Sequence, residues 1–194
     1  PPTAGMLYQI IIFLIEVAVT LLGGACLLRL YMRWRRMPMA NPVGHFVQAL
    51  SDWLVLPLQR LMPPAKQFDV ASLLAAWLLK LLQYAVLMAL VGLGSWSLLP
   101  VLALLGVAKL AASVATAVII VAAVMSWMQN RTPVSDMFER LAAPLLAPVR
   151  KLVPLVGGID LSPLLVIVAL QVIGIVLGSL QAGLWGAGAA VLAG

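Results

Sequence analysis

Charged side chains are scarce in this sequence. Only 9% of its 194 residues are Asp, Glu, Lys or Arg, whereas soluble globular domains carry about 25%. Hydrophobic residues make up 64% of the chain, and the mean hydropathy is +1.12. This composition excludes a soluble globular domain, and it also excludes a disordered chain, which needs low hydrophobicity and high charge. The chain is therefore predicted to be an integral membrane protein.

Cysteine and histidine each occur only once, as Cys26 and His45. One cysteine cannot form a disulfide within the chain and cannot build a Cys-rich metal site. Neither HExxH nor GxSxG occurs, and the motif GGID contributes a single carboxylate, Asp160. Acid–base, nucleophilic and metal-assisted mechanisms all need a second group. We expect a protein that is not an enzyme and that holds no cofactor and no metal.

Four stretches are long and apolar enough to cross about 30 Å of hydrocarbon, which takes about 20 helical residues. The predicted fold class is all-α, with four transmembrane helices at about 6–28, 70–93, 98–128 and 161–185. Breaker residues between Gly92 and Pro100 predict a turn that separates the second span from the third. The first stretch is expected to be a permanent span, because no basic segment precedes it and no small-residue cleavage site follows it.

Lysine and arginine are distributed unevenly over the connections. Ten of the twelve lie in the two long connections, after the first and third spans. These ten are Arg29, Arg33, Arg35, Arg36, Arg60, Lys66, Arg131, Arg140, Arg150 and Lys151. Because basic residues accumulate on the cytoplasmic side, both long connections are predicted to be cytoplasmic and both termini outside. The net charge of +6 is interpreted as a topology signal, so no nucleic-acid partner is expected.

The chain repeats itself after 91 positions. This shift aligns residues 41–74 with residues 132–165 without a gap. The matched pairs include Pro42 with Pro133, Pro57 with Pro148, Pro63 with Pro154, and Asp69 with Asp160. The sequence thus predicts a tandem duplication, with a first unit at 6–93 and a second at 97–185. Each unit holds two spans, so both units have the same orientation in the membrane.

Each long connection is predicted to contain an amphipathic helix in the membrane interface, at about 42–62 and 133–153. Asn41 and Thr132 are good N-cap residues, and the proline that follows each suits the first helical position. Apolar residues then recur at helical spacing on one face. Pro57 and Pro148 are expected to end or kink these helices.

The end of each amphipathic helix carries basic residues. We expect Arg60, Arg150 and Lys151 to contact anionic lipid phosphates or a partner. Asp69 and Asp160 then precede the re-entering spans, where an acidic residue suits a helix N-terminus. Ser162 and Pro163 form another pair of cap residue and first-turn proline.

The stretch RLAAPLLAPVRKLVPLVGGIDLSPLL in the second unit closely resembles the YGGT repeat of the YggT/YlmG family of bacterial and plastid membrane proteins. The first unit is a more divergent copy, with AKQFD in place of VGGID and with Ala71 and Ser72 in place of Ser162 and Pro163. The resemblance assigns structural roles in the repeat to Asn41, Pro42, Asp69, Pro133, Pro154, Gly157, Gly158, Asp160, Ser162 and Pro163.

Members of this family with two repeats are four-span proteins, and here the resemblance implies a non-enzymatic protein of the bacterial inner membrane. It also implies a link to osmotic and ion homeostasis, to division or nucleoid organisation, or, in plastids, to cytochrome assembly. None of these associations specifies a reaction.

Three charged residues fall inside the predicted spans: Glu16, Lys80 and Lys109. Each lies about 15 Å deep at the standard helical rise. Gln171 occupies the position in the second unit that corresponds to Lys80. Ionisable groups in hydrocarbon are costly and are functional candidates by default. We expect Glu16 to pair with Lys80 or Lys109. The alternatives are lysines that extend to the nearer interface, a transport path, and contact with lipid or a partner.

Small residues recur every four positions in the fourth span, at Gly174, Gly178 and Ala182. This spacing predicts close contact with another helix. The neighbour is either another span of the same chain or a second protein.

Two functions are compatible with these features. The first is a structural, assembly or accessory factor for a larger membrane complex, and the second is a small ion-linked transporter or channel that uses the three charges. The first is favoured because the spans consist mainly of Leu, Val, Ile and Ala, which line a water-filled path poorly. The expected partners are anionic lipid headgroups on the cytoplasmic side and other membrane proteins, and homo-oligomers are an alternative.

Overall fold

The computed structural model describes residues 2–62, 68–92 and 94–193. This part of the chain contains six α-helices, one short 3-10 helix and no β-strand. The helices are α1 (Pro2–Trp34), α2 (Pro42–Leu61), α3 (Val70–Val91), η1 (Trp96–Leu98), α4 (Leu99–Trp127), α5 (Pro133–Arg150) and α6 (Ser162–Ala193). Four of them, α1, α3, α4 and α6, are long and apolar enough to cross a membrane. The prediction of an all-α protein with four apolar spans is confirmed.

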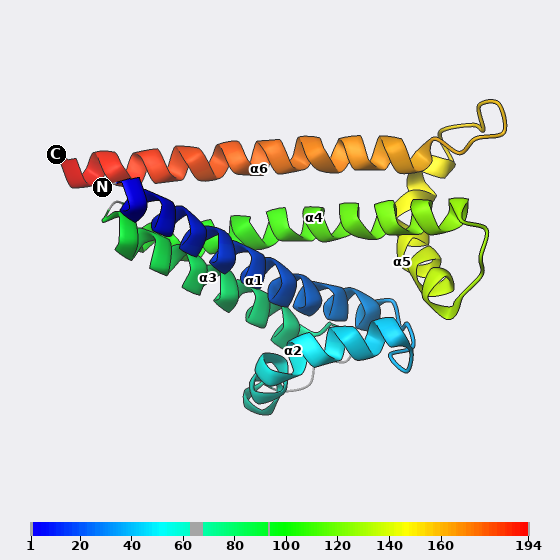
Figure 1. Cartoon of the computed structure of the whole chain (residues 1–194), viewed down its shortest axis with the longest axis horizontal. Helices are drawn as coiled ribbons and strands as arrows, with labels where there is room; N and C mark the ends of the chain where they lie inside the picture. Colours follow the sequence, from blue (N-terminus) through cyan, green and yellow to red (C-terminus); the bar gives the residue numbers. More distant parts are fainter. Residues whose placement is uncertain (1, 63–67, 93, 194) are drawn as a thin grey trace.

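Among the long helices, α1, α3 and α4 contact one another, and α6 packs against α4. Figure 1 shows both termini and the turn between α3 and α4 at one end of the molecule, and α2 and α5 toward the other. There α5 contacts α4 and α6, while α2 lies against α1 and α3. The two long connections, which contain α2 and α5, are therefore gathered away from the termini.

Two of the spanning helices extend beyond their predicted ends. Helix α1 continues past Arg29 and Arg33, because arginine is a good helix former. It ends just before Arg36, which has a φ of 53°, while Met37 donates its N–H to the Met32 carbonyl oxygen at 2.8 Å. Helix α6 continues past Trp185, because no proline interrupts the tail.

Helix α3 ends at Val91, and Gly92 follows with a φ of 68° and an N–H donated to the Met88 carbonyl oxygen at 2.9 Å. A positive φ suits glycine, which has no Cβ to clash. The predicted end of this span at Leu93 lies outside the described residues. The same is true of Pro63 and of Lys66, which contributed to the charge count.

The two amphipathic helices begin where their Asn-Pro and Thr-Pro pairs predict. The Asn41 side chain accepts the Gly44 N–H at 2.8 Å. Thr132 accepts the Ser135 N–H at 3.1 Å, and the Ser135 hydroxyl accepts the Thr132 N–H at 2.8 Å, which forms a reciprocal capping box.

Prolines do not end these helices at their own positions. Helix α2 continues through Pro57 to Leu61, and α5 continues through Pro144 and Pro148 to Arg150. Both helices stop within a few residues of their last proline, because a proline removes one backbone donor and crowds the preceding turn.

Two apolar clusters hold the helices together at the end that carries α2 and α5. The first joins α1, α2 and α3 through residues such as Cys26, Val55 and Ala75, and it includes Leu110 of α4. The second joins α1 and α2 to α4, α5 and α6, and Met32 and Leu141 are fully buried in it. A hydrogen bond from the Tyr31 hydroxyl to the Leu141 carbonyl oxygen, at 2.7 Å, links α1 to α5. The two repeats therefore share one core.

A third cluster lies toward the termini, where α3, α4 and α6 meet. Gln181 of α6 donates to the Tyr84 hydroxyl at 2.9 Å and to the Leu102 carbonyl oxygen at 3.1 Å. Tyr84 packs closely over Gly106, where a Cβ would lie 2.6 Å from the tyrosine oxygen. Because position 106 has no side chain, the Tyr84 ring can pack between α3 and α4.

The Gly106→Ala variant is expected to lower the stability of the detergent-solubilised protein by about 1–3 kcal/mol, because the added methyl group displaces Tyr84 from the Gln181 hydrogen bond. Thermal unfolding in detergent measures the effect. Gly174→Ala is the matched control, because an added Cβ there meets nothing within 4 Å. Equal decreases in the unfolding temperature of the two variants would contradict the close contact at Gly106.

Candidate functional site

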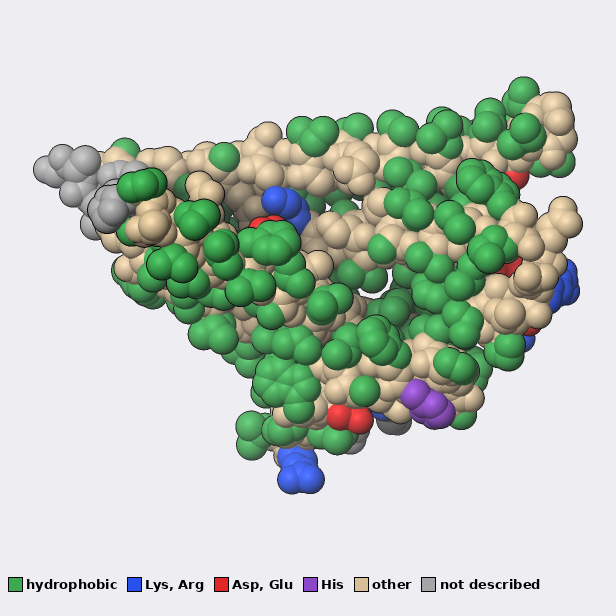
Figure 2. All heavy atoms as spheres, in the orientation of Figure 1, with side chains coloured by type: hydrophobic (Ala, Val, Ile, Leu, Met, Phe, Trp, Pro, Cys, Tyr) green, Lys and Arg blue, Asp and Glu red, His purple; other side chains and the backbone are tan. Residues whose placement is uncertain are grey.

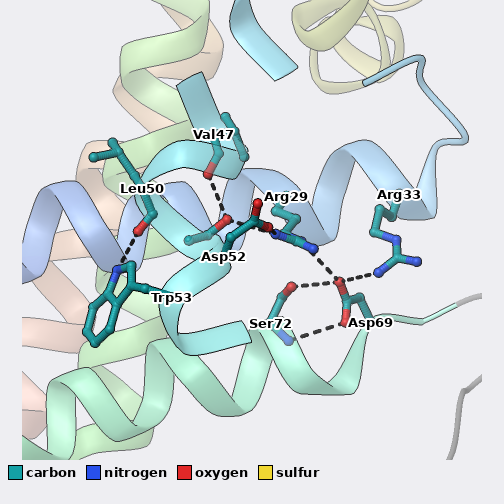
Figure 3. A network of polar contacts seen from close by, with 9 residues as sticks. Arg29, Arg33, Val47, Leu50, Asp52, Trp53, Asp69 and Ser72 are labelled. Carbon is teal, nitrogen blue, oxygen red and sulfur yellow. Dashed lines mark hydrogen bonds and ion pairs between the residues drawn. The ribbon is translucent and has the colours of Figure 1, made fainter. Parts of the chain in front are cut away.

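A buried arginine near the end of α1 organises the first repeat. The Arg29 guanidinium donates through Nη1 to the Ser51 hydroxyl at 3.1 Å and to the Asp52 carboxylate. Arg29 and Ser51 are both buried, whereas Asp52 is partly exposed. Figure 3 shows the guanidinium between α2 and the first turn of α3. One side chain of α1 therefore holds the middle of the amphipathic helix α2.

Asp69 completes this network from the start of α3. Its Oδ2 lies 3.9 Å from Arg29 Nε, too far for a hydrogen bond, and 3.1 Å from Arg33 Nη1, which donates to it. Asp69 also accepts the Ser72 hydroxyl at 2.7 Å and the Ser72 N–H at 3.3 Å (Figure 3). The same carboxylate thus caps α3 and binds the end of α1.

The environment of Asp69 keeps it ionised. Burial by itself would raise the pKa of Asp69, but hydrogen bonds from Ser72 and Arg33 outweigh it and hold the pKa below the ordinary value of 3.8. Arg29 and Arg33 face Asp52 and Asp69, so the four charges balance. A balanced and hydrogen-bonded network of this kind holds three helices in fixed relative positions.

The second repeat keeps only part of this network. Asp160 accepts from Arg150 Nε at 3.0 Å and from the Ser162 N–H at 3.0 Å. The residues that correspond to Arg29, Ser51 and Asp52 are Ile120, Ala142 and Ala143. The acidic residue before the span is present in both repeats. Its cation comes from the amphipathic helix in the second repeat and from the preceding span in the first.

The structure corrects the expectation for Ser162. We expected its hydroxyl to cap α6, but α6 begins at Ser162 itself, and the buried hydroxyl has no hydrogen-bond partner among the described residues. Asp160 accepts the Ser162 N–H instead, because a carboxylate two residues earlier reaches the first free donor of the helix.

Sequence reasoning did not identify Arg29 and Asp52 as a site. They lie 23 positions apart on different helices, and no periodic pattern connects them. Two signals were present. Arg29 is the first charge after an otherwise apolar stretch, and Asp52 falls among apolar residues of an amphipathic helix.

The charged residues within the spans are arranged differently from the prediction. Lys80 is buried, donates to the Gln83 side-chain oxygen at 3.0 Å and lies 5.6 Å from the centre of the Tyr84 ring. Glu16 and Lys109 are exposed on the surface of the chain. No ion pair within 4.0 Å involves Glu16 in the part of the chain that the structure describes. The expected direct pairing is therefore not formed among the described residues, and the Lys80 ammonium donates to Gln83, one turn away on the same helix.

Figure 2 shows hydrophobic side chains along most of the long helices. One patch of basic and acidic side chains interrupts them between α1 and α6, at the edge of a hollow.

Gln171, the polar residue expected at the depth of Lys80, is exposed, and none of the described side-chain hydrogen bonds involves it. Gln181, almost three turns further along α6, is the buried amide that joins α6 to α3 and α4. The repeat register does not identify this contact of Gln181, because it depends on Tyr84 of the neighbouring helix.

The small-residue stripe of α6 is not closely packed in the structure. A Cβ at Gly174 would meet nothing within 4 Å, and one at Gly178 would lie 3.8 Å from Lys109 Nζ. Ala182 is exposed. The close helix contact predicted from these residues stays a prediction.

The basic residues at the ends of the amphipathic helices, Arg60, Arg150 and Lys151, are all exposed. Arg150 is bound to Asp160, as described above. Residues 2–62, 68–92 and 94–193 contain no group of three or more His, Cys, Asp or Glu side chains that could hold a metal ion.

These features define a helical membrane protein with four spans and two further helices, α2 and α5, between them. A model of the CCB3/YggT family matches the chain twice, at residues 8–90 and 101–181. The chain therefore belongs to the CCB3/YggT family, as the resemblance of its second unit implied.

Relatives from several bacteria support this assignment. An uncharacterized protein named YggT from Escherichia coli strain K12 is 34% identical over 83% of this chain and 85% of its own length. A Vibrio alginolyticus protein, described as uncharacterized in the proC 3′ region, is 30% identical over 89% and 96%. An uncharacterized protein of Haemophilus influenzae is 31% identical over 82% and 86%. No solved structure matches the chain.

Replacing Arg29 by methionine should destabilise the protein strongly, because it leaves Asp52 and Asp69 without their shared cation. We expect a loss of about 3 kcal/mol in the free energy of unfolding, the lower end of the range for buried pairs because Asp52 is partly exposed. Arg33→Gln is the matched control, and its half-exposed side chain predicts a loss of about 0–1 kcal/mol. Denaturant titration in mixed micelles distinguishes them, and similar losses would contradict the central role of Arg29.

The low pKa of Asp69 predicts a defined pH dependence. Because the folded pKa lies below the ordinary 3.8, ionised Asp69 stabilises the fold above that value, and the contribution is lost as the pH falls through the folded pKa. Asp69→Asn should therefore show a flatter loss of melting temperature under acid conditions below pH 3.8. Asp136→Asn, at an exposed position, should follow the parent protein. A parental acid profile in Asp69→Asn would contradict the assignment.

Proposed function

We propose that this protein is a non-enzymatic structural, assembly or accessory subunit of a larger membrane complex. The observation that carries the proposal is the exposure of α6. This helix buries only 6% of its most apolar segment inside the chain, whereas the other three spans bury 28% to 33%. Helices in a bilayer associate through packing, so a span with so little internal packing is suited to contact another protein.

The outward face of α6 has the composition that such a contact needs. Val172, Ile175 and Val176 are exposed together along it, without a charged side chain in the whole helix. Gly183 adds a position where an approaching helix meets no Cβ. A partner helix on this face would supply the packing that α4 alone does not provide.

The polar network of the first repeat supports a structural function as well. Arg29, Arg33, Asp52 and Asp69 balance one another in charge and connect three helices, as a structural network does. Among the described residues, no group of three or more His, Cys, Asp or Glu side chains could hold a metal ion. Both points favour a scaffold over an enzyme.

The protein is placed by this proposal in the bacterial inner membrane, with both termini outside and both long connections cytoplasmic. The amphipathic helices α2 and α5 would then lie in the inner interface, with Arg60, Arg150 and Lys151 at the level of anionic headgroups. The arrangement in Figure 1, with both termini at one end and α2 and α5 toward the other, supports this orientation. Through the resemblance of its repeats, we link the complex to osmotic or ion homeostasis.

Ion-linked transport is the second candidate. Glu16 and Lys109 are exposed within spanning helices. Figure 2 shows a basic and an acidic side chain at the edge of a hollow between α1 and α6. Charged groups at such depth often mark ion pathways. The apolar walls of the spans make this the weaker candidate.

Photo-crosslinking in native membranes tests the scaffold proposal. A crosslinking amino acid at Val172 or Ile175 should produce adducts with a defined protein, because this face lies against a partner. The matched control is the exposed Leu82 on α3, from which no such adduct is expected. Absence of protein adducts from α6, or the same adducts from Leu82, would contradict the proposal.

Ion flux through liposomes distinguishes the second candidate. The scaffold proposal predicts that purified protein raises flux no more than the Glu16→Gln variant does. Flux well above empty liposomes that disappears in Glu16→Gln or Lys80→Gln would favour transport.

A further inference from the structure

The connection between α5 and α6 forms a tight hairpin. Val156 and Ile159 exchange two backbone hydrogen bonds, at 3.2 and 3.1 Å. Gly157 and Gly158 between them have φ values of 61° and 79°. Two successive residues with positive φ are typical of the type I′ turn, which glycines adopt without strain. The tip of this connection is thus a defined turn.

The base of the hairpin is fixed on both sides. Arg150, the last residue of α5, donates to Asp160 at 3.0 Å, and Asp160 accepts the first N–H of α6. This ion pair closes the loop between the two helices. It limits how far the tip can move relative to α6.

The hairpin exposes an unusual amount of apolar surface for a turn. Leu152 is 83% exposed, Leu155 69%, Ile159 64% and Val156 57%. Removing one such side chain from water stabilises a protein by about 1.5–3 kcal/mol. Four of them on a fixed turn form a surface that favours an apolar environment. We name residues 152–159 the apolar hairpin.

The apolar hairpin cannot lie far from the bilayer. Three positions separate Ile159 from Ser162, so it lies within about 11 Å of the start of the span, because an extended chain covers at most about 3.6 Å per residue. Figure 1 shows the segment beside the start of α6, at the end opposite the C-terminus and on the same side of the molecule as α5. Lys151 is exposed at its base and forms no ion pair with the described residues.

We propose that the apolar hairpin is a lipid-binding element that inserts Leu155, Val156 and Ile159 between the headgroups of the bilayer that α6 crosses. Lys151 binds the phosphate of an anionic lipid beside it. Apolar residues in the acyl boundary with a basic residue at headgroup level are typical of peripheral membrane attachment. This inference rests on the membrane location in the proposed function and adds a binding surface to it.

A comparison with the first repeat indicates that lipid, and not a protein, contacts the apolar hairpin. Leu61 corresponds to Leu152 under the 91-residue shift, and Arg60 corresponds to Lys151. Leu61 is 82% exposed, almost the same as Leu152 at 83%. The same combination of an exposed leucine and a basic residue therefore occurs at two separate places, each at the end of an amphipathic helix. A bilayer offers acyl chains and phosphates at both places. A binding pocket on a partner protein would fit only one of the two places.

Site-directed labelling tests the proposal on the full chain in vesicles of phosphatidylglycerol and phosphatidylethanolamine. A fluorophore is attached to Val156→Cys in a Cys26→Ala background and exposed to a water-soluble quencher. Asn130→Cys, in the exposed connection between α4 and α5, is the accessible control, and Val172→Cys is the membrane-embedded control. Leu155→Cys provides a second position if labelling of Val156→Cys perturbs the turn.

Insertion predicts that the hairpin labels are quenched several-fold less than the Asn130→Cys label. The protection should weaken when Lys151→Gln is added or when phosphatidylglycerol is omitted. Quenching equal to that of Asn130→Cys would overturn the proposal, as would protection that disappears when the protein is diluted in lipid, since contact between copies would then be responsible. If the Val172→Cys label is protected but the hairpin labels are accessible, the insertion of the hairpin is refuted. The proposed function is not affected by that result.

Discussion

One buried guanidinium determines how the first half of this protein is assembled. Arg29 lies where the first span ends, and it reaches both the amphipathic helix through Asp52 and the next span through Asp69. An arginine in this position would be strongly unfavourable without these carboxylates. Conversely, Asp52 would lose its cation, and Asp69 would keep only the half-exposed Arg33. The amphipathic helix α2 therefore has a fixed position against α1 and α3, in addition to the attraction of its apolar face.

The two repeats bind the acidic residue before their second span with cations from different helices. Each has an acidic residue just before its second span, Asp69 or Asp160, but the cation that binds it comes from a different helix. The second repeat has apolar residues in place of the buried network, and its amphipathic helix is held by the second apolar cluster. The Arg150–Asp160 pair is then available to fix the hairpin before α6. The first repeat therefore has a buried ion-pair network between helices, whereas the second has an exposed ion pair at the base of a loop.

Much of the fold follows from local physical chemistry and is predictable from the sequence. The four spans follow from hydropathy, and the starts of α2 and α5 follow from Asn41 and Thr132, each followed by proline. These features depend on residues within one helix or one turn. What sequence reasoning missed depends on contacts between helices. The Arg29–Asp52 pair, the choice of Gln181 over Gln171, and the binding of Lys80 by Gln83 rather than Glu16 are set by packing, which no spacing rule encodes.

The central claim is that Arg29 and Asp52 stabilise the fold together. A double-mutant cycle with Arg29→Met and Asp52→Asn, measured by unfolding in mixed micelles, tests it most directly. The account predicts that the double variant loses less stability than the sum of the two single variants, with a coupling energy of about 1 kcal/mol or more. Losses that add within about 0.3–0.5 kcal/mol would show that the two side chains act independently and would contradict the account.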